Sequence, residues 1–185
     1  MNSDLGLIKV EKLTTKEKMI FYFVLYSFIG WCLETIYAYI VFEHFVKRGF
    51  LYGPICPIYG FGAILLILNL KNIKEENKIA KFLTSMILFS LFEYIASFIL
   101  EILFHQRWWD YSNEFMNIEG RICLMFSVLW GIIGVLFVDF FHPRIKNIID
   151  KITIHIPVKI KKIIIYLLGF LFLIDEIFSI LKYLC

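Results

Sequence analysis

The sequence predicts an all-α fold: a polytopic transmembrane helical bundle of about five spans, with a broken or partly re-entrant start of span two. The chain of 185 residues is 60% hydrophobic and only 19% charged, which is too apolar for a soluble domain with a solvated surface. Apolar runs near the roughly 20 residues needed to cross a ~30 Å hydrocarbon core recur five times. They cover residues 19–42, 50–70, 82–104, 122–142 and 160–181.

Residues 1–18 predict a cytoplasmic N-terminal tail, and residues 19–185 a single membrane domain. Five spans use up the length and leave no room for a soluble catalytic or nucleotide-binding domain of the usual ~100 residues or more. The phosphate-binding motif G-x-x-x-x-G-K-[ST] is absent from the sequence. Any use of ATP therefore depends on a partner chain. We predict contacts with membrane lipids, no cofactor and no nucleic-acid partner.

The distribution of basic residues predicts the orientation, because Lys and Arg accumulate on the cytoplasmic side of a membrane. With the N-terminus inside and the C-terminus outside, 14 of the 19 Lys and Arg fall on the inner segments. The segment 148–157 between spans four and five also fits an amphipathic interfacial piece, because its isoleucines alternate with polar residues.

The start of span two is the most irregular stretch of the chain. Four glycines and two of the four prolines lie between Arg48 and Gly62. Irregular backbone at membrane depth persists only where protein buries it or where it lines a wet cavity, since each unpaired N–H or C=O costs several kcal/mol in hydrocarbon. We expect a cavity, and Tyr52 and Tyr59 are candidate binding residues beside it.

Span three carries Ser90, Glu93, Ser97 and Glu101 on one helical stripe about 80° wide. A polar stripe inside a membrane faces protein or water. Glu93 lies near mid-span, where a charged side chain costs roughly 2.5 to 3.5 kcal/mol on insertion scales and usually marks an ion, proton or substrate path. The alternative is a protonated or paired glutamate that serves only helix packing.

Span one places Glu34 on the same face as Gly30, which permits close approach of another helix. Arg48 and Arg121, at the outer ends of their segments, are the cations expected to balance Glu34 or Glu101. The sequence leaves open which arginine pairs with which glutamate.

The outer loop between spans three and four is rich in polar and aromatic residues. The candidates here are His105, Trp109, Asp110, Tyr111, Asn117 and Arg121. The aromatic residues also fit an interfacial belt, but the cluster is denser than a belt needs and suits a cationic or aromatic ligand. A metal site formed by His105, Asp110 and a glutamate is a weaker alternative, because one histidine among scattered carboxylates is a poor ligand set.

Two further patterns predict structural features. Ser127, Gly131 and Gly134 form a small-residue seam for helix packing on span four. The four cysteines lack C-x-x-C spacing and predict buried thiols, with a disulfide between Cys56 and Cys123 as the alternative.

Several strings resemble a bacterial family of small polytopic membrane proteins described as putative ABC-transporter permease, type IV. They are Trp31-Cys32-x-Glu34-Thr35, the run from Arg48 to Gly60, Phe92-Glu93-Tyr94, Trp109-Asp110-Tyr111-Ser112 and the run from Asn117 to Cys123. The resemblance covers residues 19–142. It implies a bacterial cytoplasmic-membrane protein in transport, functional roles for these polar positions, and a separate ATPase partner.

We therefore expect a membrane transport component with an outward-facing polar cavity, in which Glu34, Glu93 and Glu101 bind a cation, a proton or a positively charged solute. One alternative is an intramembrane enzyme acting on a lipid or envelope precursor, with a glutamate, His105 and Asp110 as acid and base. Another is a non-catalytic subunit or sensor whose outer loop recruits a partner.

Overall fold

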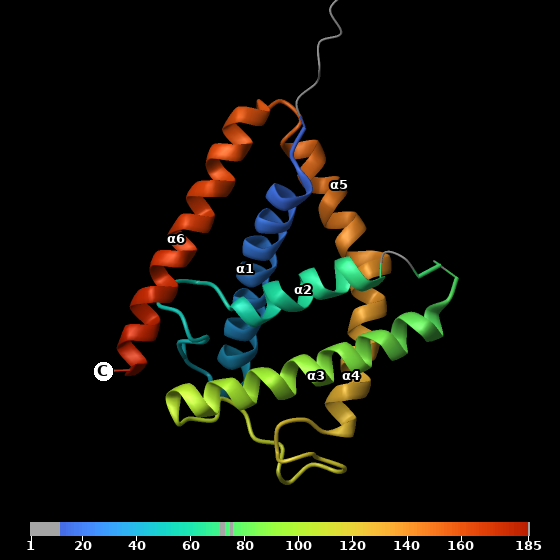
Figure 1. Cartoon of the computed structure of the whole chain (residues 1–185), viewed down its shortest axis with the longest axis vertical. Helices are drawn as coiled ribbons and strands as arrows, with labels where there is room; N and C mark the ends of the chain where they lie inside the picture. Colours follow the sequence, from blue (N-terminus) through green and yellow to red (C-terminus); the bar gives the residue numbers. More distant parts are fainter. Residues whose placement is uncertain (1–11, 71–72, 75, 185) are drawn as a thin grey trace, which may run out of the picture.

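The computed structural model describes residues 12–70, 73–74 and 76–184, and its regular elements are all helical. In order, they are α1 (Thr15–Phe42), α2 (Pro57–Leu70), α3 (Lys78–Phe104), α4 (Leu124–Leu136), the π-helical turn η1 (Phe137–Phe141), α5 (His142–Ile152) and α6 (Val158–Leu184). α4, η1 and α5 follow one another without a break and form one long helix (Figure 1). The predicted all-α class is confirmed.

Four helices are long and apolar enough to cross a membrane. They are Thr15–Phe42, Lys78–Phe104, Leu124–Ile152 and Val158–Tyr183. Large hydrophobic side chains are exposed along these helices, as expected where a helix faces lipid rather than water. The chain is a multi-pass membrane protein.

The predicted span two, residues 50–70, is longer than the helix that the structure shows there. Helix α2 begins only at Pro57 and has 14 residues, about 21 Å at 1.5 Å per residue, which is shorter than a ~30 Å hydrocarbon core. Pro57 suits the first turn of a helix because its missing N–H would have no intrahelical partner there. The predicted broken start of this segment is confirmed, since residues 43–56 form no helix.

Two other predicted boundaries also change. Helix α1 includes residues 15–18, which the sequence assigned to the tail, because Thr14 and Glu17 form a capping box; residues 1–11 lie outside the described residues. Span four was predicted to end at residue 142, but the helix continues to Ile152. The segment 148–157 is therefore helical in its first half.

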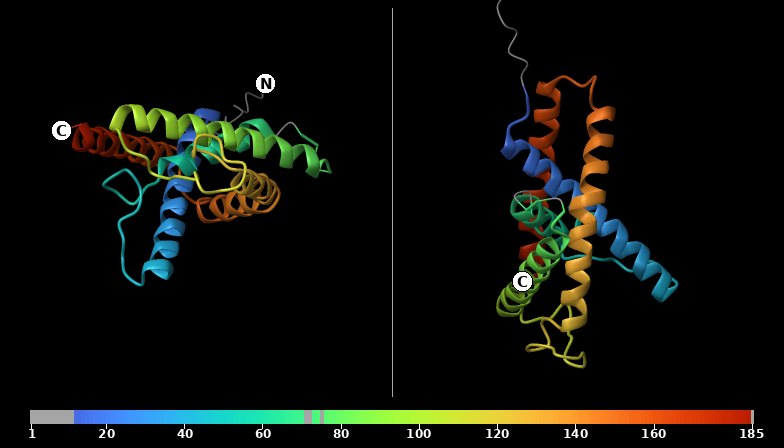
Figure 2. Two further views of the ribbon diagram at one scale, coloured as in Figure 1. Left: turned by 90° about the horizontal axis from the view of Figure 1, so that it is seen from below. Right: turned by 90° about the vertical axis from the view of Figure 1, so that its right-hand side faces the viewer.

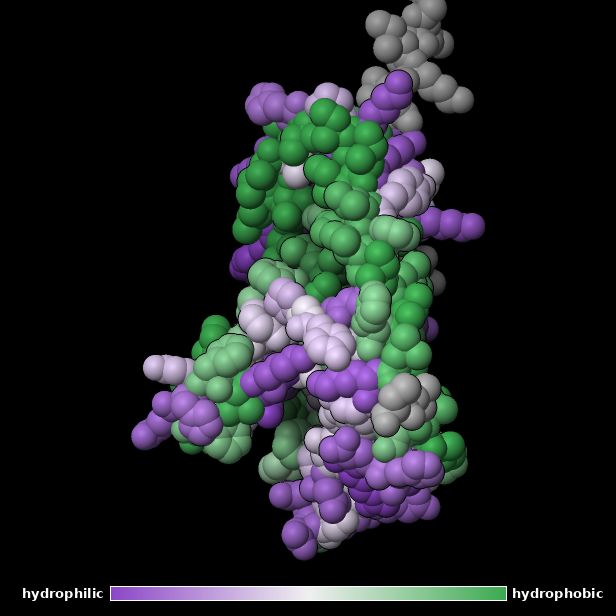
Figure 3. All heavy atoms as spheres, turned by 90° about the vertical axis from the view of Figure 1, so that its left-hand side faces the viewer, coloured by the Kyte–Doolittle hydropathy of each residue, from purple (hydrophilic) through white to green (hydrophobic). Residues whose placement is uncertain are grey.

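Helices α5 and α6 meet beside the N-terminal end of α1, and the loop 105–123 lies at the opposite end of the molecule (Figure 1). The C-terminal end of α6 lies toward that second end. Helix α2 crosses α1, and α3 crosses α4 (Figure 1). The last turns of α1 project from the rest of the bundle (Figure 2). The face in Figure 3 is mostly apolar in its upper part, with polar residues gathered in its lower part beside the projecting end of α1.

Small residues allow α4 to approach α3 closely. A Cβ added at Gly131 would lie 2.6 Å from the Phe82 ring, and one added at Gly134 would lie 2.1 Å from the Ser85 hydroxyl. Ser127 lies on the same seam and is buried. The predicted packing role of this seam is confirmed, and it fixes which face of α4 meets the polar stripe of α3.

A cluster of aromatic residues joins α1 to η1 and α5. Tyr22 and Tyr26 are buried, and the ring of Tyr26 packs edge-on against Phe137 with centroids 4.9 Å apart. The Tyr26 hydroxyl and Nδ1 of His142 are hydrogen-bonded at 2.7 Å. This contact holds the beginning of α5 against the first half of α1.

Candidate functional site

The irregular chain before α2 obtains its hydrogen bonds from two neighbouring helices. The N–H of Cys56 donates to the carbonyl oxygen of Ser27 in α1 at 3.0 Å. The N–H groups of Tyr52 and Gly53 donate to the Asp175 carboxylate in α6 at 3.0 and 2.9 Å. Protein groups therefore satisfy these parts of the loop, as required of irregular backbone at membrane depth. The predicted cavity beside this stretch stays a prediction.

Glu34 is paired with the arginine at the start of this loop. Arg48 donates from Nη2 at 3.1 Å and from Nε at 3.3 Å to one oxygen of Glu34, and the Tyr59 hydroxyl donates to the other oxygen. The side chains of Glu34 and Arg48 are about one-third exposed (31% and 32%). Gly30 makes the arrangement possible, because a Cβ there would lie 2.3 Å from the Tyr59 ring.

The cysteines are free thiols, as the sequence predicts. Cys56 and Cys123 are buried, Cys32 is half-buried, and none of the three forms a disulfide; Cys185 lies outside the described residues. Burial and, to a smaller extent, the Glu34 carboxylate raise the pKa of the Cys56 thiol to about 11, while Arg48 opposes this rise. Cys56 is therefore a packing residue of the loop and a poor nucleophile at neutral pH.

Glu93 is the most buried of the three glutamates, with 7% of its surface exposed. The Tyr111 hydroxyl donates to its Oε1 at 3.0 Å, and the indole N–H of Trp130 in α4 donates to its Oε2 at 3.1 Å. The Trp130 ring stacks on Phe89, one turn before Glu93, with centroids 4.9 Å apart. Both of these hydrogen-bond donors are neutral, so they satisfy the carboxyl oxygens without balancing a negative charge.

Tyr111 connects the loop 105–123 to the interior of the bundle. Its ring stacks on Phe126 of α4, with centroids 4.7 Å apart. Burial raises the pKa of Tyr111, and the carboxylates of Glu93 and, more weakly, Glu34 raise it further. Tyr111 is therefore the residue through which this loop contacts Glu93.

Glu101, two turns beyond Glu93 on α3, is surrounded by cations. Arg121 donates from Nη2 to Glu101 at 2.5 Å, and Arg107 donates from Nε at 2.9 Å. The guanidinium of Arg121 also binds the Ser97 hydroxyl at 3.2 Å and Glu119 at 3.3 Å. Arg121 is buried, with 7% of its surface exposed, which agrees with the expectation that a buried arginine is paired and hydrogen-bonded.

Other predicted residues of the loop hold its shape. Asp110 accepts hydrogen bonds from the hydroxyl and the N–H of Ser112, and these bonds lower the pKa of Asp110. Asn117 donates to two loop carbonyl oxygens, at 3.0 Å each. The indole N–H of Trp109 donates to the carbonyl oxygen of Arg121 at 3.0 Å. The loop is thus an ordered cap that positions Tyr111 and Arg121.

Two predicted residues point elsewhere. His105 is exposed and ends α3 in a left-handed conformation, with φ of 51°, and its N–H donates to the carbonyl oxygen of Glu101. Tyr52 is 54% exposed, and its ring lies 4.7 Å from the ammonium of Lys47. In the part of the chain that the structure describes, no group of three or more His, Cys, Asp or Glu side chains is arranged to hold a metal ion.

The polar stripe of α3 faces protein along its length, as predicted. The sequence left the arginine pairing open, and the structure resolves it as Arg48 with Glu34 and Arg121 with Glu101. Two contributors escaped sequence reasoning. Trp130 could have been found, because it is next to Gly131 in the small-residue seam of α4 and therefore near the face that packs on α3. The role of Asp175 could not be predicted, because its partners are backbone N–H groups of a loop that is distant in the sequence.

A family model described as putative ABC-transporter type IV matches residues 21–180. The chain belongs to this family. The match runs past residue 142, where the resemblance seen in the sequence ended, and includes most of α6. The curated proteins and the solved structures compared with the chain contain no match.

For this member of the putative ABC-transporter type IV family, the match includes every helix that contributes to the polar network: α1, α2, α3, α4 and α6. Glu34, Glu93 and Glu101 all lie within the matched residues. The Asp175 contact to the loop before α2 also lies within them, which is consistent with α6 being an integral part of the same bundle.

Proposed function

We propose that the protein is a membrane transport component, built as one membrane domain, that binds a proton or a small cation at Glu93 from a polar cavity opening outward. In this proposal the N-terminus lies inside and the C-terminus outside a bacterial cytoplasmic membrane. The outer end then contains the loop 105–123, whose Tyr111 reaches Glu93.

The single observation that carries this proposal is the difference in partners among the glutamates. Glu34 binds Arg48, and Glu101 binds Arg107 and Arg121. Glu93 accepts its hydrogen bonds from a hydroxyl and an indole N–H. An ionised carboxylate in a membrane needs a balancing charge, and neutral donors do not supply one. A proton or cation arriving at Glu93 would supply it.

The two hydrogen-bond donors to Glu93 come from two different elements, Tyr111 from the loop 105–123 and Trp130 from helix α4. The separate ATPase subunit suggested by membership of the family would supply energy in this scheme, and its contact surface stays unassigned.

The test is proton flux through the purified protein in vesicles loaded with a pH-sensitive dye. A potassium diffusion potential should drive proton uptake by the wild type, and Glu93→Gln should abolish that uptake. Glu119→Gln is the matched control, because Glu119 lies in the loop with its side chain 58% exposed and should leave the flux unchanged. Sodium and potassium gradients are tested in parallel.

The proposal fails if Glu93→Gln moves protons, sodium and potassium as the wild type does. It also fails if the wild type moves none of them under any gradient, with or without a co-purified ATPase. The enzyme alternative would then be tested by incubating the detergent-solubilised protein with membrane lipids and measuring lipid turnover. A sensor would show neither activity.

A further inference from the structure

A second charged cluster lies at the other end of α3, away from the three glutamates. Asp139, in the π-helical turn η1, accepts hydrogen bonds from the ammonium groups of Lys78 and Lys81, each at 2.5 Å. The Lys81 side chain is only 2% exposed and that of Asp139 is 10% exposed. Among the described residues, this cluster contains two ammonium groups and one carboxylate.

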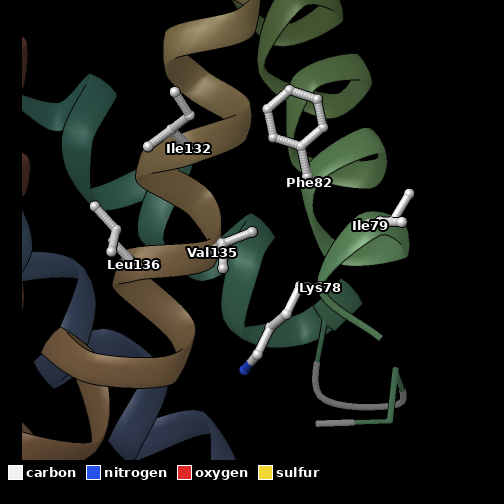
Figure 4. A pocket seen from close by; sticks show the side chains of 6 residues that line it. All are labelled: Lys78, Ile79, Phe82, Ile132, Val135 and Leu136. Carbon is white, nitrogen blue, oxygen red and sulfur yellow. The ribbon is translucent and has the colours of Figure 1, made fainter. Parts of the chain in front are cut away.

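Two hollows meet at this cluster. One, of about 330 Å³, is a groove between α3 and α4, and apart from Lys78 its lining is apolar: Ile79, Phe82, Ile132, Val135 and Leu136 (Figure 4). The other, of about 300 Å³, is bordered by Lys78, Lys81 and Asp139. Its apolar lining comes from the end of α2, the chain before α3, the turn η1 and the start of α5: Leu70, Ile73, Val138, Phe140 and Pro143. Lys78 lines both hollows, so a polar chamber and an apolar groove adjoin at one ammonium group.

We propose that the two hollows form one binding site for an anionic phospholipid. The phosphate of the headgroup would occupy the polar chamber beside Lys78 and Lys81, and an acyl chain would lie in the apolar groove. The two ammonium groups suit a phosphodiester, because each can donate charge-assisted hydrogen bonds to its oxygens. Basic pockets between membrane helices are known to bind the headgroups of anionic lipids.

The groove favours a lipid over a free anion. Ile79 is 74% exposed and Ile132 is 47% exposed, so the groove opens on the surface that faces hydrocarbon in a membrane. A free phosphate would use the polar chamber alone and leave this apolar groove without a role. The basic residues near Lys78 also belong to the segments predicted to face the cytoplasm, where anionic lipids attract lysines.

The π-helical turn η1 favours a binding role for the cluster of Lys78, Lys81 and Asp139 over a purely structural one. π-helical turns inside α-helices are rare and occur frequently at functional sites. Here the turn contains Asp139 and separates α4 from α5. A buried lysine requires a counter-ion, and Asp139 provides it when no lipid is bound. A bound phosphate would share that task, so Asp139 and the lipid compete for the two lysines.

The experiment is a lipid titration of the purified protein in detergent, read by native mass spectrometry. The probes are phosphatidylglycerol and phosphatidylcholine with identical acyl chains. The wild type should retain phosphatidylglycerol at least about fivefold better than phosphatidylcholine, which corresponds to the ~1 kcal/mol expected per lysine near an anionic lipid. Lys78→Gln should remove most of this preference. Lys78 has an exposed side chain, so this variant is expected to fold.

Two further variants separate the parts of the site. Asp139→Asn removes the competing anion and should increase retention of phosphatidylglycerol. Val135→Trp fills the groove and should reduce retention of the lipid without changing the binding of soluble glycerol phosphate. Lys47→Gln, beside Tyr52 and outside both hollows, is the control lysine and should behave as the wild type.

The proposal is overturned if Lys78→Gln retains the wild-type preference, or if Lys47→Gln loses it equally. It is also overturned if glycerol phosphate displaces the signal completely and Val135→Trp has no effect, since the site would then hold a free anion only. These readouts involve neither Glu93 nor transport, so the lipid site and the proposed function can fail independently.

Discussion

Glu93 and Glu101 lie two turns apart on the same face of α3, yet they are held in different ways. Glu101 lies among guanidinium groups from Arg107 and Arg121, near the C-terminal end of α3. Glu93 is deeper, and a tyrosine and a tryptophan bind its two oxygens. The two arginines balance the negative charge of Glu101 and hold the loop 105–123 in place. The two donors to Glu93 are neutral and balance no charge, which fits the proposal that Glu93 binds a proton or a cation.

The largest effect on stability is expected from Arg121→Ala. This change removes the guanidinium that binds Ser97 and Glu119, and with it one of the two cations on Glu101. Losing one partner of a buried charged network is strongly destabilising. The melting temperature in detergent should fall by several degrees, more than for any change at Glu93. An unchanged melting temperature would show that the arginine network does not fix the loop.

The next effect concerns the neighbourhood of Glu34. Gly30→Ala would place a Cβ 2.3 Å from the Tyr59 ring, so the tyrosine has to move away from Glu34. Overpacking of this kind typically costs about 1–3 kcal/mol, which chemical unfolding in detergent can measure. Tyr59→Phe is the matched control, because it removes the same hydrogen bond without the clash and should cost less. Equal stability of Gly30→Ala and the wild type would contradict the close contact of α1 with α2.

A smaller effect is expected from Glu93→Gln. Glutamine retains an oxygen that can accept one of the hydrogen bonds from Tyr111 and Trp130, so the free energy of unfolding should change by no more than about 1 kcal/mol. Glu93→Leu should cost more, because it leaves two buried donors unpaired. If Glu93→Leu stabilises the protein and leaves the flux intact, Glu93 serves only helix packing.

The smallest expected effect concerns Cys56, in the loop beside Glu34. It is measured as the reactivity of the thiol rather than as a change in the stability of the protein. A variant with Cys56 as its only cysteine should react slowly with maleimide at pH 7 to 8, since the raised pKa of about 11 keeps the thiol protonated. The rate should rise as the pH approaches 11, and unfolding should raise it at neutral pH. Rapid reaction of the folded protein at pH 7 would show that the loop 49–56 is open to water.

Sequence reasoning recovered those parts of the molecule that depend on local pattern. Four of the five apolar runs predicted as spans correspond to long apolar helices, and the spacing of Ser90, Glu93, Ser97 and Glu101 predicted a stripe facing protein. The small-residue seam predicted the packing face of α4. Each of these follows from helical periodicity within one segment.

The remaining features depend on contacts between distant segments. The irregular chain before Pro57 was predicted, but the groups that bind its backbone, the Asp175 carboxylate and the carbonyl oxygen of Ser27, were not. Trp130 reaches Glu93 only because the glycine seam sets the rotation of α4. The pairing of Asp139 with Lys78 requires the turn η1, for which the sequence contains no simple signal.

The most direct test of the central claim is an infrared difference spectrum of the purified protein in heavy water, recorded as the pH is lowered stepwise over the whole range in which the protein stays folded. Glu93 is shielded from water and lies between neutral donors, so proton uptake there should produce a carboxylic-acid band in the wild type and in Glu119→Gln. The band should be missing from Glu93→Gln. The same band in all three proteins would assign the proton to another group and contradict the role given to Glu93.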